Sequence, residues 1–125
     1  MLGKLLLVAG GGALGALLRY AVARAMLAVL GDGLPLGTLA ANLLGCLLIG
    51  ALWTWSEAAA FSAEARAFVF VGVLGAFTTF STFGLESMAL LRGGEVGLGL
   101  AYVAASNAGG LLLVYLGAVL AQFAL

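Results

Sequence analysis

The sequence predicts an all-α membrane protein with four transmembrane helices. Of its 125 residues, 65% are hydrophobic and only 8% are charged, whereas about 25% of the residues in an ordinary soluble domain are charged. A helix needs about 20 apolar residues to cross the roughly 30 Å of a bilayer core. We therefore expect one domain, residues 1–125, with spans at about 2–30, 36–55, 67–91 and 96–125.

The first span carries basic residues toward its two ends. Lys4, Arg19 and Arg24 are its only charged residues, and long basic side chains near helix ends reach the headgroup region. A signal peptide is the competing interpretation, because Lys4 precedes an apolar stretch and residues 21–23 resemble a small-residue cleavage site. We favour the span, since cleavage would leave too little chain.

Loop and interface signals bound the remaining spans. Glycines, an aspartate and a proline at residues 31–35 predict the first loop. The second span ends in Trp53 and Trp55, and indole rings favour the headgroup interface. Residues 56–66 read as a short polar connection, and residues 92–95 close the third span. The fourth span has no charged residue and is long enough to tilt.

Basic residues are distributed almost evenly over the two sides of such a four-span protein. Lys4 and Arg66 fall on one side, and Arg24 and Arg92 fall on the other, with Arg19 a third if it reaches that interface. Basic residues near span ends set membrane orientation. A difference of zero or one basic residue between the two sides predicts insertion in both directions. Two opposed copies would then pair as an antiparallel dual-topology homodimer.

Composition excludes several classes of function. Net charge is zero and no basic stripe is present, so nucleic acid is not an expected partner. The chain has no His and a single cysteine, Cys46, which rules out a disulfide framework and a cysteine metal site. Gly10, Gly12 and Gly15 match a dinucleotide fingerprint, but no alternating strands and helices accompany it. With no nucleophile beside a base and no paired carboxylates, the chain is not expected to be an enzyme.

Small residues recur at the four-residue spacing that lets membrane helices approach closely. The pairs are Gly11 with Gly15, Ala41 with Gly45, and Gly72 with Ala76.

The third span concentrates hydroxyls, aromatics and glycines at residues 75–84. Its threonines are poor helix formers, so we predict a break near Thr78 that frees backbone groups at membrane depth. Such groups persist only where they line a cavity or bind an ion. Carbonyls suit a small hard cation, whereas hydroxyls, an amide and the positive edges of phenylalanine rings suit an anion.

Two further pairs of polar residues share a helix face. Thr38 and Asn42 lie four apart in the second span, and Tyr102 and Ser106 lie four apart in the fourth. A hydrogen bond between helices explains each as well as a functional role does.

Three segments together resemble the Fluc, or CrcB, family of microbial fluoride channels. They are GGALGALLRY at residues 11–20, GTLAANLLG at 37–45 and GAFTTFSTF at 75–83. The last is highly specific, and length and hydropathy fit over the whole chain.

The resemblance implies an antiparallel homodimer with two fluoride pores and a structural sodium ion at its centre. The backbone carbonyls of Gly75 and Thr78 would hold the sodium. Arg19 would raise the local anion concentration at a vestibule. The matching pore residues are Asn42, Phe80, Phe83, Ser81, Thr82, Tyr102, Thr38 and, on a looser pattern, Ser106. Glu86 belongs either to this polar track or to the membrane interface.

The expected function is passive, fluoride-selective export of cytoplasmic fluoride across a prokaryotic inner membrane, which relieves fluoride toxicity. A small dual-topology proton-coupled multidrug exporter is the alternative, but it needs a carboxylate in the first span, and none is present. A second alternative is a structural subunit that carries no ion. A different, oppositely oriented partner chain also remains open, although the charge balance favours the homodimer.

Overall fold

The computed structural model describes residues 1–125 and is helical throughout, with four helices long and apolar enough to cross a membrane. The four candidate spans are Leu2–Leu30, Leu36–Ala58, Ala63–Arg92 and Val96–Ala124. In chain order the elements are α1 (Leu2–Leu30), α2 (Leu36–Ala58), α3 (Ala63–Arg66), the π-helical η1 (Ala67–Leu74), α4 (Gly75–Phe77), α5 (Phe80–Arg92), α6 (Val96–Ala104), the π-helical η2 (Ala105–Gly109) and α7 (Gly110–Ala124). The predicted four-helix architecture is confirmed.

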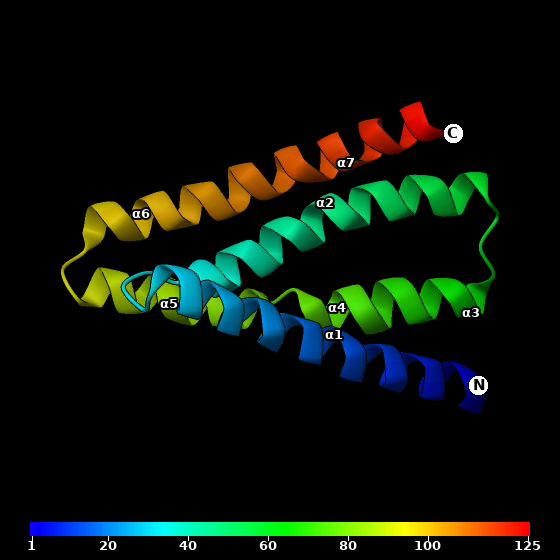
Figure 1. Ribbon diagram of the computed structural model, residues 1–125, viewed down its shortest axis with the longest axis horizontal. Coiled ribbons are helices and arrows are strands. Elements are labelled where there is room, and N and C mark those ends of the chain that lie inside the picture. Colours follow the sequence, from blue (N-terminus) through cyan, green and yellow to red (C-terminus); the bar gives the residue numbers. More distant parts are fainter.

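The spans run alternately up and down, and both termini lie at the same end (Figure 1). Short connections force this antiparallel arrangement. Gly31 and Gly94, both with positive φ, stand in the connections at the other end, where a left-handed turn favours glycine. The first span packs along η1 and α4, and α2 packs along α7. Large apolar side chains cover much of the outer surface, as expected for a surface that faces lipid.

Glycines bring the backbones of neighbouring spans into direct contact. A Cβ added at Gly11 would lie 2.6 Å from the Phe68 carbonyl oxygen, and one at Gly15 would collide with the Val73 carbonyl oxygen. Gly50 and Gly117 make equally close contacts between α2 and α7. The packing role predicted for Gly11 and Gly15 is confirmed, and these contacts fix where the third span lies.

The connection between the second and third spans is shorter than the predicted one, which covered residues 56–66. Helix α2 continues to Ala58 because Trp53 Nε1 donates to Glu57 Oε1 at 3.0 Å and the Ser56 hydroxyl donates to the Trp53 carbonyl oxygen at 2.8 Å. The Arg66 guanidinium lies over the Trp53 ring, 5.2 Å from its centroid. These polar residues therefore extend helices instead of forming a loop.

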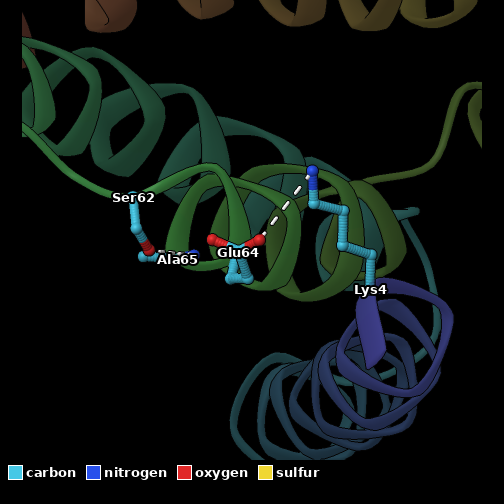
Figure 2. A network of polar contacts seen from close by, with 4 residues as sticks. All are labelled: Lys4, Ser62, Glu64 and Ala65. Atoms are coloured by element: carbon cyan, nitrogen blue, oxygen red, sulfur yellow. Dashed lines mark hydrogen bonds and ion pairs between the residues drawn. The ribbon is translucent and has the colours of Figure 1, made fainter. Parts of the chain in front are cut away.

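The third span begins beside the start of the first. The Ser62 hydroxyl accepts the Ala65 N–H at 3.1 Å, which caps α3. Glu64 forms an ion pair with Lys4, with 3.8 Å between Oε1 and Nζ (Figure 2). Both side chains are about half exposed, so the pair adds little stability by itself.

We predict that Gly15→Ala destabilises the protein, whereas Gly10→Ala does not. The new methyl group at residue 15 collides with the third span, and overpacking costs about 1–3 kcal/mol. A methyl group at residue 10 meets nothing within 4 Å. Thermal unfolding of both variants in detergent measures the difference, and equal unfolding temperatures would contradict this packing.

Candidate functional site

The third span is interrupted at Thr78 and Thr79, which we call the break. Both residues have extended dihedrals, φ −90° and ψ 158° for Thr78 and φ −151° and ψ 123° for Thr79. The break predicted near Thr78 is confirmed. Because each helical N–H bonds to the carbonyl four residues earlier, two extended residues release several donors and acceptors in the middle of a membrane span.

The Asn42 side chain from α2 pairs with the backbone of Thr79. Its Oδ1 accepts the Thr79 N–H at 2.7 Å, and its Nδ2 donates to the Thr79 carbonyl oxygen at 2.9 Å. Asn42 thus supplies the acceptor and the donor that a continuous helix would provide to the N–H and carbonyl groups of Thr79. The amide has two N–H groups, so one remains for a ligand.

These bonds release the two carbonyls that the sequence resemblance singles out. In a continuous helix the Gly75 carbonyl accepts the Thr79 N–H, but that N–H bonds to Asn42. The Thr78 carbonyl would accept the Thr82 N–H, which instead bonds to the Thr79 hydroxyl at 3.3 Å. Both carbonyl oxygens therefore lose their helical partners and are free to accept from a ligand.

Thr79, which sequence reasoning did not assign a role, caps the helix after the break. Its hydroxyl accepts the Thr82 N–H and donates to Thr82 Oγ1 at 3.1 Å. A threonine three residues before the capped N–H is a typical helix start. The segment Thr79-Phe80-Ser81-Thr82 therefore carries a sequence signal for the start of a helix at Phe80.

A cavity of about 320 Å³, which we call the phenylalanine cavity, opens along one side of the break. Phe80 lies at its edge with 80% of its surface exposed, whereas Phe83 is 8% exposed. Ring centroids are 5.5 Å apart from Phe80 to Phe83 and 5.4 Å from Phe83 to Tyr102. The buried Ser106 hydroxyl has no hydrogen-bond partner. The lining residues are Asn42, Gly45, Cys46, Ile49, Phe70, Leu74, Gly75, Thr78, Thr79, Phe80, Phe83, Ser106 and Asn107.

A second cavity of about 390 Å³, the arginine cavity, is lined by Ala16, Arg19, Tyr20, Ala23, Gly37, Thr38, Thr82 and Glu86. The Glu86 carboxylate accepts from the Thr38 hydroxyl at 2.8 Å and from the Tyr102 hydroxyl at 2.7 Å. Glu86 therefore belongs to the polar network inside the bundle. Thr38 and Tyr102 are joined through this carboxylate and not directly.

The predicted site residues divide into groups. Asn42, Phe80, Phe83 and Ser106 line the phenylalanine cavity together with Gly75 and Thr78. Thr38, Thr82 and Arg19 line the arginine cavity. Tyr102 is buried and connects them through Phe83 and Glu86. Ser81 lies exposed outside both cavities, with its hydroxyl 3.4 Å from that of Thr79.

Chemically, the site offers hydrogen-bond donors, free carbonyls and aromatic rings. Amide and hydroxyl donors stabilise an anion, and free carbonyl oxygens stabilise a cation. Two hydroxyl groups of the network already donate to Glu86, whereas Asn42 and Ser106 offer donors to the phenylalanine cavity. This chemistry suits the binding of small ions.

Comparison with known proteins finds full-length relatives. Residues 6–118 match the family model described as "CrcB-like protein, Camphor Resistance (CrcB)". The chain is 52% identical over 122 residues to a protein of Salinibacter ruber named fluoride-specific ion channel FluC, covering 98% of this chain and 92% of that protein. Proteins of the same name from Thermus thermophilus and Parabacteroides distasonis are 53% and 44% identical. The match to the Thermus protein covers 91% of this chain and 90% of that protein, and the match to the Parabacteroides protein covers 95% of this chain and 93% of that protein.

We predict that Asn42→Leu lowers the stability of the protein far more than Asn107→Leu does. Leucine has the same number and branching of side-chain heavy atoms but leaves the Thr79 N–H and carbonyl without partners, at about 1–3 kcal/mol for each buried group. The exposed Asn107 amide bonds only to the Val103 carbonyl one turn away in its own helix. Equilibrium unfolding in detergent gives both values, and similar losses would exclude the pairing of Asn42 with the break.

Proposed function

Because this chain belongs to the CrcB family, we infer that it is a fluoride-specific ion channel embedded in a lipid bilayer, and not an enzyme. The observation that carries this conclusion is identity above 50% to proteins named fluoride-specific ion channel FluC, over more than nine tenths of the chain. Four apolar spans and an interrupted third span lined by donors support it.

The proposed fluoride path follows the donors around the break. Fluoride would give up part of its hydration and be held by the second N–H of Asn42 and by the Ser106 hydroxyl, which has no protein partner. The edges of Phe80 and Phe83 carry partial positive charge and would hold the same anion. Thr38, Ser81, Thr82 and Tyr102 would form the polar continuation of the path, and larger chloride would fit this narrow route poorly.

An antiparallel, dual-topology homodimer is the proposed assembly. The even distribution of basic residues supports insertion in both orientations. The exposed Phe80 ring, next to the break in the middle of a span, supports a second copy on that face. A closed two-fold pair would place equivalent residues of both copies around one axis.

A structural sodium ion is the proposed cofactor of this dimer. Sodium binds well to carbonyl oxygens, and the carbonyls of Gly75 and Thr78 have lost their helical partners through the bonds of Asn42 and Thr79. Two carbonyls from each protomer would give the ion four oxygen ligands. The bound cation would join the two breaks and offset the charge of nearby fluoride.

The proposed physiological role is passive export through a multi-pass protein of the inner membrane. Fluoride would leave the cytoplasm down its electrochemical gradient and cease to be toxic there. A proton-coupled exporter is disfavoured because α1 contains no carboxylate. A structural subunit without conduction is the other alternative, and it predicts no ion flux.

Fluoride efflux from liposomes tests the function. Purified protein is reconstituted, valinomycin sets the membrane potential, and fluoride and chloride electrodes follow release in parallel. Rapid fluoride release without chloride release is the expected result. If protein confirmed to be dimeric and supplied with sodium releases no fluoride, the proposed channel function of this chain alone is excluded.

Replacing the path phenylalanines should slow this flux. We expect Phe80→Leu and Phe83→Leu each to lower fluoride efflux by about tenfold, since the loss of about 1.4 kcal/mol of interaction with the passing ion corresponds to that factor. Phe123→Leu is the matched control, because this ring is 86% exposed in the last turn of α7. Flux unchanged by both path variants would contradict their assignment.

Sodium removal should weaken the assembly. Protein purified with N-methylglucamine in place of sodium is expected to unfold at a lower temperature and to conduct less, and added sodium should restore both properties in a saturable way. The binding term RT ln(1 + [L]/Kd) sets the size of the stability change. Unfolding and flux independent of sodium would rule out this cofactor.

A further inference from the structure

Arg19 makes the one side-chain hydrogen bond from α1 to the backbone beside the break. Its Nε–H donates to the Ala76 carbonyl oxygen at 3.1 Å in a partly buried position, across 57 residues of sequence. In a continuous helix the Ala76 carbonyl would accept the N–H of Phe80, but Phe80 begins a new helix after the break. Arg19 thus supplies the donor that the break removed.

We propose that Arg19 is a positioning residue that fixes the break, and that its Nε–H hydrogen bond, not its charge, is what conduction requires. Helix α4 is the last turn of the helical stretch that runs through α3 and η1, and the carbonyls of a last helical turn have no N–H partner within the helix. Arg19 holds Ala76 before the break and Asn42 holds Thr79 within it. The two side chains come from different spans, so together they set the conformation of the backbone between them.

The surroundings of Arg19 argue against a purely electrostatic role. The arginine cavity is lined by one cationic side chain, Arg19, and one carboxylate, Glu86. Opposite charges around one cavity cancel much of the field that would concentrate anions there. The directed bond to Ala76 is independent of this cancellation, because a hydrogen bond depends on local geometry.

Two variants separate the bond from the charge. In Arg19→Gln the amide nitrogen stands as many bonds from Cα as arginine Nε does, so the donor remains and the charge is lost. In Arg19→Lys a methylene group occupies that place and the ammonium nitrogen stands one bond farther out, so the charge remains and no donor occupies the position of Nε. Arg24→Gln is the charge control, because Arg24 is exposed on the same helix and makes no side-chain hydrogen bond. This test uses the flux of the proposed channel, normalised to folded protein.

We expect R19Q and R24Q to keep flux within about threefold of wild type, and R19K to lose about tenfold, the upper end of the usual worth of an intramolecular hydrogen bond. The opposite order of R19Q and R19K overturns the proposal in favour of an electrostatic vestibule. Loss of flux in both variants, or in neither, also overturns the proposal. If R19K does not fold, Arg19→Leu, which lacks both the donor and the charge, takes its place: loss of flux in R19L with flux kept in R19Q supports the proposal, and flux kept in both overturns it.

Amide hydrogen exchange supplies a readout that does not depend on conduction. In R19K, exchange at residues 79–82 should quicken by about tenfold with little change in Gly110–Ala124, and R19Q should exchange like wild type. A general loss of stability would raise exchange in both segments, which would overturn a local role for Arg19. A wild-type protein that releases no fluoride would refute the proposed function, and this exchange pattern would still decide the role of Arg19.

Discussion

The constraint on which the rest of the structure depends is the satisfaction of backbone hydrogen bonds inside the membrane. Hydrocarbon offers no partner to a free N–H or carbonyl group, yet Thr78 and Thr79 leave the helical conformation in the middle of a span. Asn42, Arg19 and the Thr79 hydroxyl each replace a missing partner. The carbonyls of Gly75 and Thr78 are left without their helical partners, and we propose them as ligands for a cation.

Close packing at glycines brings the neighbouring helices near enough to the break for these replacement hydrogen bonds to form. Asn42 has a short side chain, so the backbone of the break must lie close to α2. Gly45 meets the Thr78 side chain with no room for a Cβ, and Gly15 lies directly against Val73. The wider π-helical turns of η1 and η2 flank the same cavity, with Ser106 in η2. Such turns are frequent at functional sites, and here they adjust the register of the helices around the break.

Polar groups around the break divide into those bonded within the protein and those with a donor left unused. Glu86 accepts from Thr38 and Tyr102 and so joins α2, α5 and α6. Asn42 has one amide hydrogen engaged by the backbone and one available, which places it in both groups. The Ser106 hydroxyl makes no bond within the protein. In a channel, donors that are fixed but incompletely used bind a small anion without requiring the backbone to rearrange.

The sequence by itself determined the membrane class, the four spans, the close glycine contacts and the place of the break. These properties depend on hydropathy, spacing and local conformational preference, all of which act over a few residues. Only the tertiary structure decided that Asn42 and Arg19 bond to the backbone of the third span, that Glu86 lies inside the polar network, and that Ser81 lies outside both cavities. The partners of Asn42 and Arg19 are 37 and 57 residues away. Which backbone group a donor meets over such separations is fixed by how the helices pack, and not by the identity of the donor.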